Sequence, residues 1–232
     1  MKKKIGILGW KTGENSFGAT VPYLEFIQQY GYPVILNPES PVDLSLDLLI
    51  IPGGPDVDPL RYNEIPSYST GKVDPIREYY DKFIIPHYID NDIPIFGICR
   101  GFQTLSVAFG ATLDQDMYHE TSEKHRGELV HELLLDQVAF IALVEDNLSI
   151  DNNSIIREFK KLKVNSLHHQ AVVRTKEFND QITVLGTYKG VYEGQYPEVI
   201  LHNTKPIAAV QYHPEELGYD LISDILILNI IK

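Results

Sequence analysis

Short apolar runs recur along the chain and alternate with segments whose apolar residues lie three and four positions apart. The first pattern is typical of buried strands and the second of helices. The strands predicted in this way are Lys4–Gly9, Pro33–Leu36, Leu46–Ile51, Ile93–Phe96 and Pro206–Val210. The predicted helices are Phe17–Tyr30, Pro75–Tyr88, Phe102–Phe109 and Gly218–Ile230. This alternation predicts an α/β fold in which an open, mostly parallel sheet carries helices on both faces.

The second half of the chain is less regular. Two apolar stretches, Leu133–Val144 and Ile182–Leu201, predict further strands, and the second contains turns at Gly186, Gly190 and Gly194. The polar stretch Glu145–Asn153 predicts a surface connection. Because no repeat, low-complexity tract or linker interrupts the sequence, residues 1–232 are expected to form a single domain.

A predicted strand runs directly into a predicted helix at Gly97-Ile98-Cys99-Arg100-Gly101, around the one cysteine of the sequence. Glycines two before and two after a nucleophilic residue, at a strand-to-helix turn, are typical of a nucleophile elbow. A side chain at either glycine would collide with the turn. Such a turn exposes the sulfur at the carboxyl end of the sheet and at a helix N-terminus, which favours the thiolate. The alternative is a structural cysteine that lies between two glycines.

A second polar stretch, Gln211-Tyr212-His213-Pro214-Glu215, also follows a buried strand. The carboxyl ends of parallel strands meet at one edge of a sheet, so this stretch is expected to face Cys99. In that position His213 would take the thiol proton, and Glu215 would hold the imidazole in the required tautomer. The sequence therefore predicts a catalytic triad of Cys99, His213 and Glu215.

The loop Pro52-Gly53-Gly54-Pro55 follows a third buried strand and is expected at the same edge. Backbone N–H groups of Gly54 and Arg100 are the natural pair for an oxyanion hole, although a plain tight turn explains the loop equally well. Further on, Arg77 and Asp81 have the spacing of an ion pair on one helix face, for which a solvated surface pair is the ordinary interpretation. Together, the predicted triad and the predicted oxyanion hole indicate acyl transfer through a thioester.

Composition narrows the functional class. The net charge of −12 argues against a nucleic-acid-binding protein, because phosphate contacts require a basic face. A single cysteine excludes an internal disulfide framework and fits a reducing compartment. The basic start, Met1-Lys2-Lys3-Lys4, is followed by an apolar run too short for a signal peptide, and no stretch has the length of a membrane span. The chain is therefore expected to be cytoplasmic, without a membrane or nucleic-acid partner.

Histidines and acidic residues gather in one segment, which raises the question of a metal site. His119, His125 and His131 lie among several glutamates there. Their spacing matches no familiar zinc-ligand pattern, so no metal site is expected.

The combined motifs resemble the class I glutamine amidotransferases. The resemblance rests on the cysteine elbow with Gln103, the Pro52–Pro55 loop and the stretch Gln211–Glu215. Three further stretches resemble the gamma-glutamyl-gamma-aminobutyrate hydrolase branch: Pro52–Pro59 with Tyr62, the helix start Arg77–Asp81, and Asn165–Val172. The similarity covers nearly the whole chain.

The resemblance implies a flavodoxin-like class I glutamine amidotransferase fold and hydrolysis of a gamma-glutamyl amide to glutamate and an amine, without a metal or organic cofactor. It implies that Cys99 is the nucleophile, His213 the base and Glu215 the acid that orients the base. It also implies that Gly54 and Arg100 form the oxyanion hole. It also implies that the gamma-glutamyl head group lies near Gln103, Asn165, Ser166, His168 and His169.

The sequence departs from that branch in places that leave the substrate open. Gly110–Asp116 has Ala and Asp where the branch usually has Gly and Tyr. In the helix start, Glu78 replaces the usual Asp, and Asp81 takes the position of the usual Glu. The loop Asn63–Lys72 follows no familiar pattern. One alternative is a glutaminase subunit that supplies ammonia to a separate synthetase partner. Another is a non-catalytic scaffold that keeps the fold. A homodimer also remains open.

Overall fold

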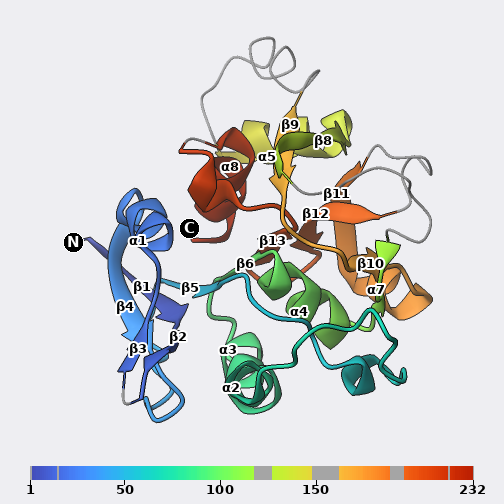
Figure 1. Cartoon of the computed structure of the whole chain (residues 1–232). Helices are drawn as coiled ribbons and strands as arrows, with labels where there is room; N and C mark the ends of the chain where they lie inside the picture. The colour runs from blue at the N-terminus through green and yellow to red at the C-terminus, as the bar shows by residue number, and fades with distance from the viewer. Residues whose placement is uncertain are drawn as a thin grey trace.

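The computed structural model of the chain describes residues 2–14, 16–117, 127–147, 162–188, 196–218 and 220–231. Within these ranges a nine-stranded sheet forms the centre of the molecule, with strand order β4-β1-β5-β6-β13-β12-β11-β8-β9 (Figure 1). Its strands are β1 (Lys3–Leu8), β4 (Gly31–Leu36), β5 (Leu48–Ile51), β6 (Ile95–Ile98), β8 (Gly127–Leu135), β9 (Lys163–Ser166), β11 (Ile182–Tyr188), β12 (Pro197–His202) and β13 (Ile207–Val210).

The sheet has a parallel part and an antiparallel part. Strands β4, β1, β5, β6 and β13 pair in parallel, which confirms the open parallel sheet predicted from the alternating pattern. From β13 onwards, β12, β11, β8 and β9 add in antiparallel fashion. The five strands predicted from the clearest apolar runs are thus the parallel strands, and their carboxyl ends form one edge.

Helices cover both faces of the sheet, as predicted. One face packs against α1 (Val21–Gln28), α5 (Gln137–Asn147) and α8 (Leu221–Ile230). The other packs against α2 (Pro75–Tyr79), the π-helix η2 (Tyr80–Ile84), α3 (Ile85–Asp90), α4 (Arg100–Ala108) and α7 (Lys176–Gln181). Alternate side chains of a strand point to opposite faces, so Leu48 and Ile50 of β5 join the first apolar cluster, while Leu49 and Ile51 join the second.

Smaller elements border the carboxyl edge of the sheet. The hairpin β2 (Trp10–Gly13) and β3 (Ser16–Gly18) directly follows β1, and β7 (Thr112–Asp114) pairs with β10 (Ala171–Val173). Two short 3-10 helices, η1 (Pro59–Tyr62) and η4 (Pro214–Glu216), lie in the loops after β5 and β13. None of the helices in the described part of the chain combines the length and apolar character needed to cross a membrane.

The turn predicted at Gly186 is wrong, because this residue lies within β11 and pairs with Val199 of β12, while Gly190 and Gly194 lie outside the described residues. Two predicted elements are wrong in part. The helix predicted over Phe17–Tyr30 begins only at Val21, because the residues before it form β3. The strand predicted over Leu133–Val144 is the end of β8 followed by α5. Asp136 separates the two, because its side chain accepts a hydrogen bond from the Ala139 backbone N–H at 3.1 Å and so caps the helix.

Candidate active site

The turn between β6 and α4 has the strained geometry predicted for a nucleophile elbow. Cys99 adopts φ 52° and ψ −104°, a conformation that L-residues rarely take, and its side chain is buried. A Cβ atom added at Gly97 would lie 2.8 Å from the Gly101 backbone, and one at Gly101 only 2.0 Å from the Ile51 carbonyl oxygen. The two glycines therefore allow α4 to start directly against β5, with Cys99 at the carboxyl edge.

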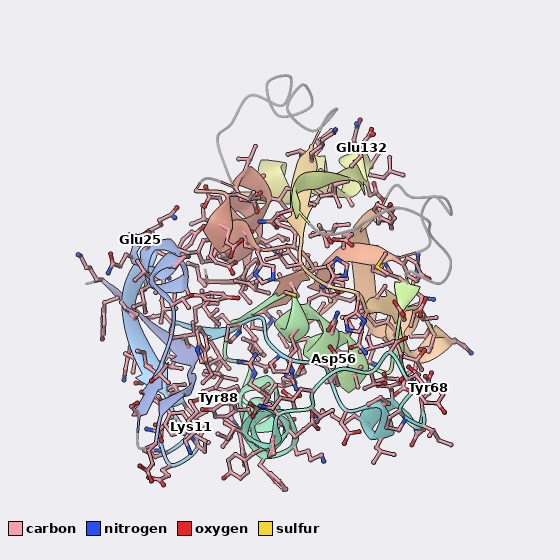
Figure 2. The ribbon with its side chains drawn as sticks, in the orientation of Figure 1. Lys11, Glu25, Asp56, Tyr68, Tyr88 and Glu132 are labelled. Carbon is pink, nitrogen blue, oxygen red and sulfur yellow. The ribbon has the colours of Figure 1, made fainter. Side chains whose placement is uncertain are left out.

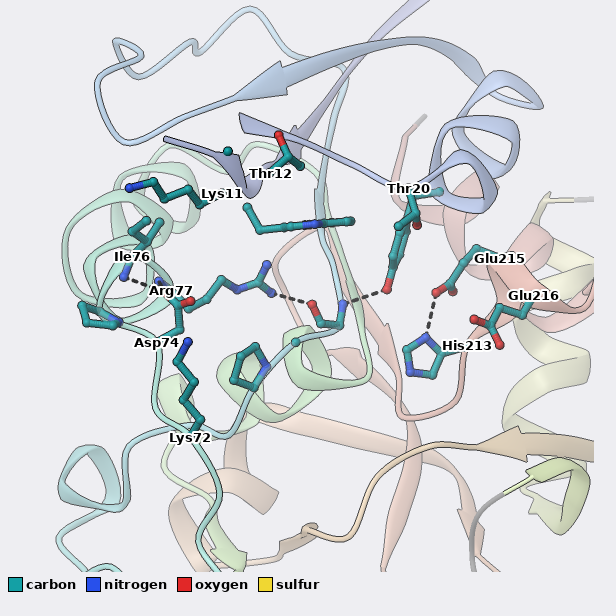
Figure 3. Close-up of a pocket in the computed structure, with 17 residues that line it drawn as sticks. Lys11, Thr12, Thr20, Lys72, Asp74, Ile76, Arg77, His213, Glu215 and Glu216 are labelled. Atoms are coloured by element: carbon teal, nitrogen blue, oxygen red, sulfur yellow. Dashed lines mark hydrogen bonds and ion pairs between the residues drawn. The ribbon is translucent and has the colours of Figure 1, made fainter. Parts of the chain in front are cut away.

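The loop after β5 lies against this elbow, as predicted. A Cβ atom added at Gly53 would lie 2.8 Å from the His213 ring, 3.0 Å from the Tyr23 hydroxyl and 3.5 Å from Cys99 Cβ. The Gly53 N–H donates to the Tyr23 hydroxyl at 2.9 Å (Figure 3). Burial, followed by the negative charges of Glu215 and Cys99, raises the pKa of Tyr23 well above its usual value, so this hydroxyl stays neutral.

Arg77 holds the same loop from the opposite side. Its guanidinium donates to the carbonyl oxygens of Pro52 and Gly53, the latter at 3.0 Å (Figure 3). Burial, and then the positive charge of Arg100, lowers the pKa of Arg77 to about 10, so it remains charged at neutral pH. In a trans peptide the C=O and the following N–H point in opposite directions. The Gly54 N–H therefore points away from Arg77, and Gly54 lines a common cavity with Cys99.

The side chain of Arg100 is buried beneath the elbow and anchors it. Its Nη2 donates to Asp81 at 2.8 Å and to Glu78 at 3.1 Å, and its Nη1 donates to Thr104 at 3.0 Å. The solvated surface pair expected for Arg77 and Asp81 is therefore wrong. Both side chains are buried, and each binds a different partner: Arg77 binds backbone carbonyls and Asp81 binds Arg100.

His213 and Glu215 form a hydrogen-bonded pair beside Cys99. The distance from His213 Nδ1 to Glu215 Oε1 is 2.7 Å (Figure 3). Burial lowers the pKa of His213, but the negative charge of Cys99 and the hydrogen bonds to Cys99 and Glu215 outweigh it and raise that pKa above its usual value. The structure thus brings the three predicted triad residues together, with His213 between the thiol and the carboxylate.

The backbone of His213 is fixed by a side chain from β9. Asn165 Oδ1 accepts from the His213 N–H at 2.8 Å, and Asn165 Nδ2 donates to the His213 carbonyl at 2.9 Å. Asn165 and Ser166, which were expected near the head group, are buried but do not line the cavity that contains Cys99. Asn165 instead holds the loop that presents the imidazole.

A small cavity of about 270 Å³ opens at Cys99. Its lining includes three residues expected near the head group, Gln103, His168 and His169. It also includes Asp56, whose carboxylate lies 3.1 Å from His169 Nε2 and which is labelled in Figure 2, and Gln170, whose buried side-chain amide makes no hydrogen bond to the described residues. A carboxylate, imidazole rings and side-chain amides therefore surround a space next to the thiol.

A wider cavity of about 1040 Å³ lies on the other side of Gly54. It is lined by the hairpin residues Trp10, Lys11 and Thr12, by the loop residue Lys72, and by Arg77, His213 and Glu215. Figure 3 shows the side chains of Lys11 and Lys72 on the side of this cavity away from His213. The two cavities thus share Gly54, and the triad lies between them.

Residues 11–215 match the Peptidase C26 family, a range that includes the elbow, the Pro52–Pro55 loop and the His213–Glu215 pair. The chain belongs to the Peptidase C26 family. It is 29% identical over 206 residues to the glutamine amidotransferase-like protein YvdE of Lactococcus lactis, covering 83% of this chain and 78% of YvdE. It is also 29% identical over 224 residues to the carbamoyl phosphate synthase small chain of Gracilaria tenuistipitata, covering 93% of this chain and 45% of that protein.

The Peptidase C26 assignment agrees with the fold. A glutamine amidotransferase from Thermotoga maritima superposes with a TM-score of 0.54 at 17% identity, covering 93% of this chain and 77% of that one. The predicted class I glutamine amidotransferase fold is therefore confirmed. The chain is a glutamine amidotransferase-type protein within this family.

Several residues of this Peptidase C26 site were not predicted from sequence. Tyr23 comes from α1 and gave no local signal, because helical spacing marks it only as a core residue. Gln211 and Gln170 lie in predicted motifs but were given no role, and their contacts depend on strands that are distant in the sequence. Asp56 follows Pro52-Gly53-Gly54-Pro55, and its place in the loop after a buried strand was the available signal.

The described residues include one group with the donor atoms of a metal site, formed by His213, Glu215 and Glu216, whose ligand atoms lie within 4.8 Å of one another. The hydrogen bond between His213 and Glu215 already uses two of these donors. His119 and His125 lie outside the described residues, as does the side chain of His131.

Proposed function

We propose that this protein hydrolyses a gamma-glutamyl amide, of the gamma-glutamyl-gamma-aminobutyrate type or a related one, to glutamate and an amine. The observation that carries the proposal is the 2.7 Å hydrogen bond between His213 Nδ1 and Glu215 Oε1, directly beside the strained Cys99. An imidazole held by a carboxylate next to a thiol on an elbow is the arrangement that acyl transfer requires.

In the proposed reaction, His213 takes the proton of the Cys99 thiol, and the sulfur attacks the amide carbonyl carbon. The carbonyl oxygen becomes an oxyanion that the N–H groups of Gly54 and Arg100 receive. When the C–N bond breaks, the amine leaves with the proton from His213, and a gamma-glutamyl thioester remains. Water then attacks the thioester while His213 takes its proton, glutamate leaves, and the thiol regains the proton.

The direction of the Gly54 N–H supports this oxyanion hole. Arg77 binds the Gly53 carbonyl at 3.0 Å, so the Gly54 N–H of the same peptide unit points to the opposite side. Arg100 is the first residue of α4, where backbone N–H groups have no partner within the helix. A Cβ atom at Gly54 would lie 3.2 Å from the Arg100 side chain, so the loop after β5 packs against the first residue of α4.

The two cavities support a substrate with two unequal parts. The small cavity at Cys99 suits the gamma-glutamyl group, whose ammonium and carboxylate need polar partners such as Asp56, His169 and Gln103. The wide cavity beside His213 suits the leaving amine, because His213 must deliver a proton to it. A cavity of about 1040 Å³ has room for an amine much larger than ammonia.

A glutaminase subunit that supplies ammonia to a synthetase is the second candidate. It is favoured by the similarity to a carbamoyl phosphate synthase small chain, which spans 93% of this chain. Such a subunit would use the same triad with glutamine as its substrate, and a partner would cover the wide cavity. The third candidate, a non-catalytic scaffold, gives no reason for the paired His213 and Glu215 beside a thiol.

Glutamate release from the purified protein tests the proposal. The substrates are glutamine and a panel of gamma-glutamyl amines, and Cys99→Ala is the control variant. Rapid turnover of one gamma-glutamyl amine that is abolished in Cys99→Ala would support the hydrolase. Slow turnover of glutamine alone would favour the glutaminase subunit, and size-exclusion chromatography would then test for a synthetase partner or a homodimer. If no substrate gave Cys99-dependent turnover, the hydrolase proposal would be overturned for this panel.

The proposal includes a cytoplasmic location, because the reaction requires Cys99 as a free thiol. Cys99 is the one cysteine in the sequence and is buried. A reducing compartment keeps such a thiol available for catalysis.

A further inference from the structure

Three buried glutamines form a continuous chain of hydrogen bonds behind Cys99. Gln211 Nε2 lies 3.8 Å from Cys99 Sγ, within hydrogen-bonding distance for sulfur. Gln103 Nε2 donates to Gln211 Oε1 at 3.2 Å and to the backbone carbonyl of Gln170 at 3.1 Å. All three residues are at most 4% exposed, so water does not compete for these groups.

The backbone carbonyl at one end of this chain fixes the orientation of both side-chain amides. A side-chain amide can rotate by half a turn and exchange its donor and acceptor, but a backbone carbonyl only accepts. The Gln170 carbonyl therefore requires the NH₂ group of Gln103. The same NH₂ group faces Gln211, which must present its Oε1 in return. The NH₂ group of Gln211 is then left facing the sulfur of Cys99.

A second donor reinforces this fixed end. His168 Nδ1 lies 2.9 Å from the same Gln170 carbonyl, so His168 donates there as well. The two donors use both lone pairs of the carbonyl oxygen. The Gln103 amide thus donates to a backbone carbonyl whose two lone pairs are both in use. The orientation of the Gln103 and Gln211 amides therefore does not depend on whether a substrate is bound.

We propose that Gln211 is a hydrogen-bond donor to the Cys99 thiolate and that Gln103 is the positioning residue that keeps the Gln211 amide in the donating orientation. This inference rests on the proposed role of Cys99 as nucleophile. An N–H donor stabilises the charged thiolate more than the neutral thiol. Its contact with the sulfur does not involve the substrate, so the donor is in place beside the elbow before substrate binds.

The other groups that face Cys99 come from different elements. His213 approaches from the segment after β13, and the Tyr23 hydroxyl approaches from α1. The backbone N–H groups of the first turn of α4 lie on a third side. The guanidinium of Arg100 is directed away, towards Glu78 and Asp81. Gln211 is therefore the side-chain amide that contacts the sulfur, and its removal leaves the His213 ion pair in place.

Direct titration of the thiolate tests the inference without any substrate. Because the chain has one cysteine and fourteen tyrosines, the absorbance near 240 nm of Cys99→Ser is subtracted from that of each protein to isolate the thiolate signal. In Gln211→Met we expect the thiolate signal to appear about one to two pH units higher than in the unmodified protein. The rate of iodoacetamide alkylation against pH should shift in the same direction.

Two further variants distinguish loss of the Gln211 N–H donor from loss of side-chain packing. Gln211→Glu keeps the size and the acceptor for Gln103 but replaces the donor with a carboxylate, so its shift should exceed that of Gln211→Met. Gln103→Met leaves Gln211 intact but free to rotate, and a smaller shift in the same direction is expected. Gln181→Met is the matched control, since Gln181 bonds to the Phe109 and Glu177 carbonyls away from the site, and its titration should be unchanged.

The outcome is decided by the titration together with the melting temperature of each variant. An unchanged thiolate titration in folded Gln211→Met would overturn the inference, as would an unchanged titration in Gln211→Glu if the Met variant does not fold. A shift in Gln211→Met with none in Gln103→Met would overturn the positioning role of Gln103 alone. Because no turnover is measured, these results stand apart from the success or failure of the proposed hydrolase.

Discussion

Arg77 binds the carbonyl oxygen of Gly53 at 3.0 Å, and through the planar peptide it sets the direction of the next N–H group. The loop after β5 has glycines at both positions, so nothing in its own side chains fixes this direction. A buried cation from α2 does so instead. The orientation of the proposed oxyanion hole thus depends on a residue that lies behind the loop.

This relationship predicts that Arg77→Lys lowers kcat about tenfold or more with little change in KM. A lysine keeps the charge, but its shorter side chain does not bring the ammonium to the position from which Arg77 Nη2 donates to both carbonyls. Loss of a whole oxyanion donor costs about 10²–10³ in kcat. Steady-state kinetics on the substrate identified above measures the effect. Arg174→Lys is the matched control, since Arg174 bonds to Asn179 at an exposed site. An equal rise in KM at constant kcat would contradict this role.

Gly101→Ala is predicted to destabilise the protein by about 3 kcal/mol or more, because a well-packed site must be forced apart. The added Cβ atom would lie 2.0 Å from the Ile51 carbonyl oxygen. Gly218→Ala is the matched control: its φ is 74°, but nothing lies within 4 Å of the added atom. That variant should lose about 1 kcal/mol from backbone strain. Urea unfolding measures the free energy of unfolding of both variants. Equal losses would show that the close approach of α4 to β5 does not cause the destabilisation in Gly101→Ala.

Glu215→Gln is predicted to lower kcat about 10²-fold or more, because the amide no longer stabilises the imidazolium or selects its tautomer. Burial lowers the pKa of His213, but Cys99 and Glu215 raise it above its usual value. The variant removes one of the raising contributions. The alkaline limb of the pH dependence of kcat/KM, where His213 loses its proton, should therefore move to lower pH. An unmoved alkaline limb would exclude His213 as the group that titrates there.

The same pKa shift has a consequence for stability. The pKa of His213 is higher in the folded than in the unfolded protein, so protonation of this ring favours the fold. Its contribution is fully present below the unfolded pKa of about 6.5 and is lost as the pH rises through the folded value. The free energy of unfolding should therefore decrease from neutral to alkaline pH. In Cys99→Ser, which lacks the thiolate charge, the decrease should be smaller when urea unfolding is compared at each pH.

Chelators are predicted to leave the activity unchanged, because the proposed reaction uses His213 and Glu215 as a hydrogen-bonded pair. Zinc is predicted to inhibit, since the ligand atoms of His213, Glu215 and Glu216 lie within 4.8 Å of one another. Activity with EDTA and with added Zn²⁺ measures both effects. Glu216→Gln should keep the activity but require more zinc for inhibition, in contrast to Glu215→Gln. Loss of activity in EDTA that Zn²⁺ restores would contradict a metal-free mechanism.

The strands, the elbow and the loops of the site were predictable because their signals are local. Glycine spacing around Cys99 and polar residues directly after apolar runs indicate a strand end without knowledge of the partner strands. The environment of Arg77 and Asp81 was not predictable, because their spacing of four residues suits a helix-surface pair. Asp81 binds Arg100 from another helix, and Arg77 binds the carbonyls of the loop after β5, so both partners are set by tertiary structure.

The misread strand at Leu133–Val144 has a comparable cause. Residues 133–144 are almost continuously apolar, so neither a period of two nor one of 3.6 stands out. The available signal was Asp136, which interrupts the run and is a favoured N-cap residue. The placement of Asn165 against the His213 backbone also follows from tertiary structure, because β9 and the loop after β13 meet only in the folded chain.

Two lysines on the wide cavity give a prediction about the leaving amine. Lys11 and Lys72 line the side away from His213, and they are exposed in a protein of net charge −12 (Figure 3). If the amine carries a carboxylate, Lys11→Met and Lys72→Met should each raise its KM about two- to fivefold without changing kcat, as expected for a solvent-exposed ion pair. The effect should shrink at high salt.

Two controls make this prediction specific to the cavity. An uncharged gamma-glutamyl alkylamine should show the same KM in the lysine variants and in the unmodified protein. Lys176→Met, on α7, changes the net charge equally and should leave the KM of both substrates unchanged. If Lys176→Met raised the KM of the carboxylate-bearing substrate as much as Lys72→Met, the effect would come from the overall charge of the protein. The wide cavity would then have no role in recognising the amine.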